Sequence, residues 1–475
     1  MSSAPSQLSA KEPMTEDRLV YRIIRQIVFS LVRLYYPRLE VHGAEKIPAG
    51  KPIIFVPNHP NGLLDPILIM LTMERPVSFL AKGTLMGNPV GRLFLGAFAA
   101  LPIFRMRDSG QLGGPVDEAD MRTKNESTFS LCRDILHQGG AMAIFPEGKT
   151  HSESYLSEFK TGAARIALSA EAEAEWGDDL RIVPVGLWYE DKTMFRSSVL
   201  VVIGDPYDIH SYREAYETDP YQTAHDMTAK LKTDLDEVVL QAENNDLLAA
   251  IPAVARWVEP QFDELPLINQ HGLTSEMIDA YSFIQTDQPD RLAAFSTDAR
   301  KYARALHTLG IDDPWELEIP AATKGRPWRL LTFLILAFPF ALVGALISYF
   351  PYRMAKPVAI KVMGDDTSTI STVKLILGAL FVLIGYIILA CLVGSWSNSS
   401  WIGLLSFIIF PMLGYLALIW GEGFEEWSTL TSYHWLRLAR TELVGALKQQ
   451  RENLADQVRE ALEDYRNSEQ LKNSY

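Results

Sequence analysis

The segment Pro52-Ile-Ile-Phe-Val-Pro-Asn-His-Pro-Asn-Gly-Leu-Leu-Asp-Pro66 joins an apolar run to a cluster of polar side chains. Residues 52–56 have the composition of a buried β-strand. His59 and Asp65 follow the expected end of this strand, and the pair Asn61-Gly62 between them favours a turn. Polar residues directly after a strand can reach a cleft at the edge of a sheet, so the segment indicates both a fold class and a site.

Three more apolar runs of strand type lie downstream, at 141–145, 180–185 and 199–203. Helical patterns lie between them, at 125–138 and 162–176. Strands that alternate with helices predict an α/β domain with a mostly parallel sheet, which we expect over residues 37–210.

His59 is the candidate general base, because an imidazole can accept a proton at neutral pH. Asp65 can hold its tautomer and stabilise its charged form. No Ser or Cys nucleophile accompanies the pair, which favours direct attack by an acceptor hydroxyl. Taken alone, the two residues could equally be a surface histidine and a helix-capping aspartate.

Three further blocks follow in order. They are Leu101-Pro-Ile-Phe-Arg105-Met-Arg107, Phe145-Pro-Glu147-Gly148-Lys149-Thr150 and Ile182-Val-Pro184-Val-Gly-Leu187. Together with the His59 block they resemble the glycerolipid acyltransferase superfamily, the glycerol-3-phosphate and 1-acylglycerol-3-phosphate acyltransferases, over roughly residues 40–205. The resemblance implies that the donor is an acyl thioester and that the acceptor carries a phosphate.

The resemblance also implies residue roles. His59 is the general base and Asp65 its orienting partner. Arg105 binds the acceptor phosphate, for which the guanidinium fork is suited. Glu147 and Gly148 shape the acceptor site, and Pro184 shapes the acyl or acceptor pocket. Asn58 is either a hydrogen-bond partner that orients the base or a turn residue. Further phosphate candidates, each also explicable as a solvated surface charge, are Arg107, Lys149 and Arg196.

Five residues separate His59 from Asp65, one more than the common family pattern. Neither spacing puts both on one helix face, so the segment must bend, and Asn61-Gly62 allows it. The longer gap, the stretch 186–197 and the membrane runs that follow the domain are similar to the fungal-type glycerol-3-phosphate/dihydroxyacetone-phosphate acyltransferases. The preferred acceptor is therefore glycerol-3-phosphate or dihydroxyacetone phosphate. The alternatives are a lysophospholipid such as 1-acylglycerol-3-phosphate, and a membrane scaffold with an inactive domain.

The flanking regions differ in character. Residues 1–16 are expected to be a disordered tail, and 17–36 an amphipathic helix in a membrane interface or, alternatively, packed on its own domain. Residues 211–322 read as an acidic helical accessory region, and 421–475 as a charged helical tail. Residues 111–322 carry 17 Lys/Arg against 38 Asp/Glu, which argues against a nucleic-acid partner.

Within residues 323–420, three uncharged runs, 330–350, 375–394 and 401–420, are each about the ~20 residues needed to cross a bilayer. They predict an integral membrane protein. Positively charged residues next to membrane helices favour the cytoplasmic side, and here they lie before the first run, between the first two runs and after the third. We therefore expect 330–350, with Pro339 at its middle, to dip into the membrane and return, and the other two runs to form a hairpin. The catalytic domain would then face the cytoplasm.

Partners and cofactors follow from the same features. We expect membrane lipids, an acyl thioester (acyl-CoA or acyl carrier protein) and a phosphate-bearing glycerol acceptor as partners. Cys132 and Cys391 are the two cysteines and can build neither a disulfide framework nor a zinc site. No nucleotide-binding fingerprint is present, so no cofactor or metal is expected beyond the acyl donor.

Overall fold

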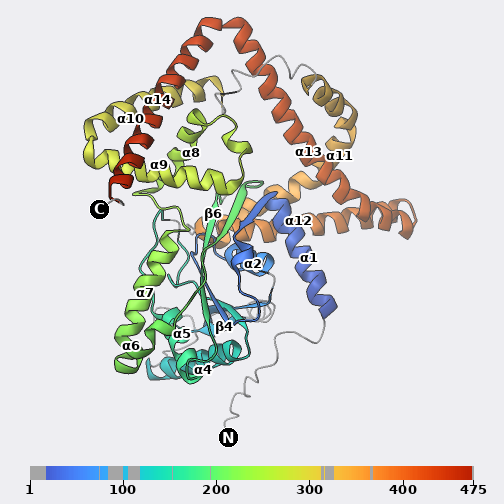
Figure 1. Ribbon diagram of the computed structural model, residues 1–475. Coiled ribbons are helices and arrows are strands. Elements are labelled where there is room, and N and C mark those ends of the chain that lie inside the picture. Colours follow the sequence, from blue (N-terminus) through green and yellow to red (C-terminus); the bar gives the residue numbers. More distant parts are fainter. Residues whose placement is uncertain are drawn as a thin grey trace. The chain divides into compact units, whose positions relative to one another are not determined.

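The computed structural model describes residues 18–73, 75–83, 100–104, 118–151, 153–192, 194–311, 315, 326–363 and 367–472. The chain forms two compact units (Figure 1). The first comprises Met1–Leu240 with Asp366–Thr372, and the second comprises Gln241–Asp365 with Val373–Tyr475.

The first unit is an α/β domain. Its strands are β1 (Arg38–His42), β2 (Ile53–Pro57), β3 (Val77–Lys82), β4 (Ala100–Ile103), β5 (Ala141–Ala143), β6 (Arg181–Tyr189), β7 (Ser198–Ile203) and β8 (Tyr207–Asp208). Its helices are α1 (Arg18–Tyr35), α2 (Leu64–Thr72), α4 (Glu118–His137), α5 (Gly162–Glu173), α6 (Arg213–Thr218) and α7 (Pro220–Asp236).

The strands form one sheet in the order β1-β7-β6-β2-β5-β3-β4, and β8 pairs with the amino end of β6. The strands from β6 to β4 are parallel, as predicted, whereas β7 is antiparallel to β6. Every residue of β2 and β7 is buried, as expected for strands covered on both faces. The carboxyl ends of β2, β5 and β6 therefore lie side by side at one edge.

Helices cover the sheet in two layers. α4, α5 and α7 pack against one another, and α2 contacts β3 on the other face (Figure 1). This arrangement follows from right-handed crossovers, because β2 to β3 moves across the sheet in one direction and β4 to β6 in the other. α7 begins where the Asp219 carboxylate accepts the Tyr221 and Gln222 backbone N–H groups, with Pro220 in the first turn.

The amphipathic helix α1 ends on its own domain. Val32, Tyr35 and Tyr36 are buried, and the Arg25 guanidinium donates to the Leu71 carbonyl at 2.8 Å. Ile27 remains exposed. The last turns of α1 therefore pack on the α/β domain.

The second unit contains a helical bundle built from two distant parts of the chain. α8 (Asn245–Val258), α9 (Leu267–Asp287) and α10 (Pro289–Leu309) pack with α14 (Thr441–Lys472). Trp257, Tyr302 and Leu454 belong to one buried core that also includes Tyr433. Arg291 pairs with Glu460 and Asp464 across the bundle. The later part of the accessory region, from α8 to α10, therefore forms one structural body with α14, whereas α6 and α7 belong to the α/β unit.

Three helices of this unit are long and apolar enough to cross a membrane, within Pro327–Lys361, Val373–Trp396 and Ser400–Tyr433. They belong to α11 (Arg326–Met363), α12 (Thr367–Trp396) and α13 (Ser400–Ala439). Their length and apolar surface indicate a membrane-associated protein.

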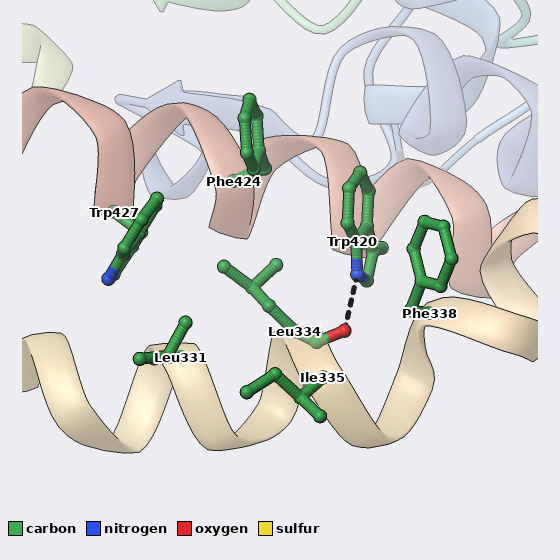
Figure 2. Close-up of a pocket in the computed structure, with 7 residues that line it drawn as sticks. All are labelled: Leu331, Leu334, Ile335, Phe338, Trp420, Phe424 and Trp427. Atoms are coloured by element: carbon green, nitrogen blue, oxygen red, sulfur yellow. Dashed lines mark hydrogen bonds between the residues drawn. The ribbon is translucent and has the colours of Figure 1, made fainter.

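Glycines let α11 and α13 approach closely. A Cβ at Gly344 would lie 1.9 Å from the Leu413 carbonyl oxygen. Nearer the amino end of α11, the Trp420 indole N–H of α13 donates to the Leu334 carbonyl at 2.8 Å, and Phe338 flanks the indole (Figure 2). Small residues at a helix contact are typical of packing between membrane helices.

α11 stays helical through Pro339, from Arg326 to Met363. Beside Pro339, the Trp420 indole N–H adds a second donor to the Leu334 carbonyl and ties this part of α11 to α13. The contacts of α11 change near Ser348, whose hydroxyl meets that of Tyr386 in α12 at 2.8 Å. Pro351 then lies against Gly385.

Candidate active site

Three neighbouring parallel strands bring the candidate site together. His59 follows β2, Glu147 follows β5, and Tyr189 is the last residue of β6. Because the carboxyl ends of parallel strands meet at one edge of the sheet, residues 88 and 124 positions apart in sequence become neighbours there.

His59 and Asp65 are in direct contact. The His59 Nδ1 lies 2.8 Å from the Asp65 Oδ2, and the Asp65 side chain is completely buried while 16% of the His59 side chain is exposed. The carboxylate accepts the Nδ1 proton, so the unprotonated ring nitrogen is Nε2. This is the tautomer that a general base requires.

The bend predicted between the two residues is present at Asn61-Gly62. Gly62 has a positive φ of 40°, and the Leu64 N–H donates to the Asn61 carbonyl as α2 begins. The Asn61 N–H donates to the Asp65 Oδ2 at 2.7 Å. Asp65 lies in the first turn of α2, where the helix dipole favours a negative charge. The fifth residue of the gap is accommodated by this turn.

Tyr189 completes the surroundings of Asp65. Its hydroxyl donates to the Asp65 Oδ1 at 2.5 Å. Burial raises the pKa of Tyr189 well above its usual value, and the adjacent Asp65 charge raises it further. The phenol therefore stays protonated and acts as a donor. Next to it, the buried Tyr36 accepts from the Asn61 side chain and donates to the Lys192 carbonyl.

Glu147 lies behind the backbone of the candidate base. Its side chain is fully buried, Oε1 accepts the His59 N–H at 3.1 Å, and Oε2 accepts the Ser157 N–H and hydroxyl at 3.0 and 2.9 Å. Oε2 also pairs with His151. Burial acts to raise the pKa of Glu147, but the bonds from His151 and Ser157 outweigh it and leave the pKa below its usual value. Glu147 therefore supports the loop that carries His59, and its predicted role at the acceptor site stays a prediction.

The neighbours of His59 are aromatic and polar. Phe145 stacks on the imidazole with ring centroids 4.1 Å apart. The His151 N–H donates to the His59 carbonyl. Asn58 fixes the same loop from the other side, since its side chain exchanges two hydrogen bonds with the Leu187 backbone, at 2.7 and 3.1 Å. Asn58 thus ties the end of β2 to β6.

The predicted cations are placed unevenly. Lys149 is exposed, and Gly148 before it has a positive φ of 62° that closes the turn after β5. Arg196 lies in the loop between β6 and β7, and its N–H donates to the Tyr35 carbonyl. Arg105 and Arg107 lie outside the described residues. Pro184 is buried inside β6, paired with Val56, and lies away from the strand end.

Lys192 is a cation that the sequence reasoning missed. It lies in the loop after β6, and its ammonium is 3.4 Å from the Pro60 carbonyl, next to His59. Burial lowers its pKa, while Asp65 and Asp191 act to raise it. Tyr189 and His151 were also missed. The available signal was position, because each lies within or just after a strand end that meets the same edge as His59.

The geometry supports proton abstraction from an acceptor. His59 offers Nε2, Asp65 holds the opposite nitrogen, and Glu147, Asn58 and Tyr189 fix the two. A hydroxyl group that meets Nε2 can lose its proton as it attacks an electrophile.

Comparison with known families gives two matches. The Acyltransferase family model matches residues 38–188. The model of the glycerol-3-phosphate acyltransferase 2 C-terminal domain matches residues 250–467. The first range contains β1 to β5 and most of β6, and the second contains most of the bundle and the three long apolar helices.

Comparison with individual proteins gives the following similarities. A glycerol-3-phosphate O-acyltransferase 2 from Saccharomyces cerevisiae is 30% identical over 44% of this chain and 28% of its own length. A glycerol-3-phosphate O-acyltransferase 1 from the same yeast is 22% identical over 98% of this chain and 74% of its own length. A crystal structure of a 1-acyl-sn-glycerophosphate acyltransferase from Thermotoga maritima covers 48% of this chain and 85% of its own at 17% identity, with a TM-score of 0.32.

Proposed function

We propose that this chain, which belongs to the glycerolipid acyltransferase family, transfers a fatty acyl group from a thioester to a hydroxyl of glycerol-3-phosphate or dihydroxyacetone phosphate in phospholipid synthesis. The observation that carries the proposal is the His59–Asp65 pair, held at 2.8 Å at the edge of the sheet. Similarity to two yeast glycerol-3-phosphate O-acyltransferases supports this choice of acceptor.

The proposed reaction proceeds by direct attack. His59 Nε2 takes the proton of the acceptor hydroxyl as its oxygen bonds to the thioester carbonyl carbon. The carbon–sulfur bond then breaks, and the imidazolium returns the proton to the leaving thiolate. Asp65 stabilises the imidazolium throughout. The reaction needs only the acyl donor and the acceptor.

The acceptor phosphate requires a cationic site. Lys192 and Arg196 come from the β6–β7 loop at the same edge as His59. Arg105 remains the phosphate ligand that the family resemblance implies, and Arg107 and Lys149 remain candidates. A guanidinium–phosphate pair would orient the hydroxyl toward Nε2.

The test is acyl transfer by the purified full chain in lipid nanodiscs, with radiolabelled acyl-CoA and, in separate reactions, glycerol-3-phosphate, dihydroxyacetone phosphate and 1-acylglycerol-3-phosphate. We expect His59→Ala to lower kcat by roughly 10²–10⁴. His225→Ala, at an exposed position of α7, is the matched control and should keep full activity. Full activity of His59→Ala would refute the catalytic assignment. A clear preference for 1-acylglycerol-3-phosphate would refute the acceptor.

We also propose that the catalytic unit, the bundle and the C-terminus face the cytoplasm. α8–α10 precede the apolar helices and α14 follows them, yet they share one core. They must therefore lie on one side of the membrane, which requires an even number of crossings between them. Among the described residues, no candidate span lies between His59 and α10.

The contacts of α11 suggest which helix does not cross. From Leu334 beside Trp420 to Gly344 beside Leu413, α11 approaches the turn between α12 and α13. From Pro351 beside Gly385 to Ala355 beside Gly378, it moves away from that turn along α12. Its deepest residue, Ser348, is level with Tyr386, roughly 17 Å along α12 from the turn. In this proposal, α12 and α13 cross and α11 dips in and returns.

Cysteine labelling tests this topology. In a background with Cys391→Ser, we introduce cysteine separately at Asn398, in the α12–α13 turn, at Asp365 and at the exposed Gln449 of α14. Asp365→Cys and Gln449→Cys should react with an impermeant maleimide from the cytoplasmic face, and Asn398→Cys only from the opposite face. Labelling of Asp365 and Gln449 from different faces would show that α11 does not return as proposed.

A further inference from the structure

The Asp65 carboxylate is bound at both oxygens by groups from three parts of the chain. Oδ2 takes His59 Nδ1 at 2.8 Å and the Asn61 N–H at 2.7 Å, whereas Oδ1 takes the Tyr189 hydroxyl at 2.5 Å. Tyr189 reaches this oxygen because β6 pairs in register with β2 and extends beyond it. None of the four sequence blocks includes Tyr189.

We propose that Tyr189 is a positioning residue that sets the basicity of His59 through Asp65; this rests on the proposed function. A phenol that donates to Oδ1 draws negative charge away from Oδ2. Asp65 then stabilises the imidazolium less strongly than an isolated carboxylate would. The same bond fixes the carboxylate plane, so Oδ2 faces Nδ1.

Other charged and titratable groups face this pair and must be kept constant in a test. Lys192 acts on Asp65 and has Asp191 and Glu153 around it. Tyr36 lies against Tyr189 with ring centroids 5.6 Å apart and is also influenced by Asp65. Glu147, paired with His151, accepts the His59 N–H from the β5 side. Only Tyr189 donates a side-chain hydroxyl to Asp65 within the described network.

Loss of the Tyr189 hydroxyl should shift the pH dependence of kcat in one direction. In Tyr189→Phe, the Asp65 charge concentrates on the oxygen that faces the imidazole, and His59 holds its proton to higher pH. The acid limb of the kcat–pH profile should therefore move to higher pH. The less tightly oriented carboxylate should lower kcat by roughly tenfold, as for loss of one hydrogen bond to a charged group. KM for the acceptor should change little.

Tyr207→Phe is the matched control. Tyr207 lies on β8, which pairs with the opposite, amino end of β6, and its phenol also faces a carboxylate, that of Asp234. Its loss removes a buried phenol from the same domain without touching the site. We expect the wild-type pH profile, kcat and KM from this variant.

A second variant covers the case in which Tyr189→Phe does not fold. Fluorotyrosine incorporated at position 189 keeps the ring and hydroxyl but is the stronger donor, so the acid limb should move to lower pH. Melting temperatures of all variants report folding. If neither variant moves the limb while His59→Ala is inactive, the role of Tyr189 is refuted and the proposed function stands. If His59→Ala is active, the proposed function itself fails.

Discussion

At the residue scale, the site combines a local motif with distant supports. His59 and Asp65 lie within one seven-residue stretch, so their proximity follows from the turn at Asn61-Gly62. Glu147 and Tyr189 reach them only through strand pairing. The motif therefore identified the candidate pair, but the burial of Glu147 behind His59 could not be read from it.

A buried histidine outside the candidate site leads to a prediction about how stability depends on pH. His271 in α9 is 7% exposed, and burial lowers its pKa to about 4, against ~6.5 for an unfolded chain. Between pH 4 and pH ~6.5, the unfolded state therefore binds more protons than the folded state. The stability contributed by the neutral histidine is complete above pH ~6.5 and is lost as the pH falls toward 4, by roughly 3 kcal/mol.

Thermal unfolding of the full chain in detergent between pH 7 and 4.5 checks this prediction. His271→Leu should lose less of its Tm over this range than the wild type does. His307→Gln, at an exposed position of α10 in the same bundle, should follow the wild type. Identical pH dependence of the wild type and His271→Leu would count against the prediction.

At the element scale, the four predicted runs correspond to the interior strands β2, β5, β6 and β7, whereas the interior strand β3 and the edge strands β1 and β4 were not predicted. The runs at 52–56 and 199–203 match β2 and β7, whose residues are buried throughout. β1 and β4 lie at the two edges of the sheet, and most of their residues are only partly buried. Edge strands need less apolar sequence, so the pattern that indicates a strand is weaker there. The antiparallel β7 follows from its short connection to β6, since a parallel crossover needs a dozen or more residues.

Close helix packing in the second unit leads to a prediction for Gly344. A Cβ there would lie 1.9 Å from the Leu413 carbonyl oxygen, so Gly344→Ala must push α11 away from α13. Gly421→Ala is the control, because nothing lies within 4 Å of its Cβ position and alanine favours a helix over glycine by about 1 kcal/mol. In nanodiscs, Gly344→Ala should lower Tm, and Gly421→Ala should keep or raise it. Equal Tm values for the two variants would argue against tight packing at Gly344.

At the scale of the whole molecule, the second unit joins segments that seemed separate. The acidic region before the apolar helices and the charged tail after them share a core that includes Trp257 and Leu454. Arg466 of α14 pairs with Glu276 of α9, so part of the negative charge of the accessory region meets positive charge from the tail. In the proposed topology, this assembly is the reason for an even number of membrane crossings and for the return of α11 to the side from which it enters.

The sequence by itself determined the fold class, the resemblance to acyltransferases, the candidate pair His59 and Asp65, and the candidate membrane helices. Each of these depends on patterns within one stretch of chain: strand-like runs, a turn between His59 and Asp65, and long uncharged segments. Only the tertiary structure decided that Tyr189 binds Asp65, that Glu147 lies behind the base, and that α14 completes the bundle. Such contacts join residues far apart in the chain. They depend on the order of the strands and the packing of helices, which local periodicity does not specify.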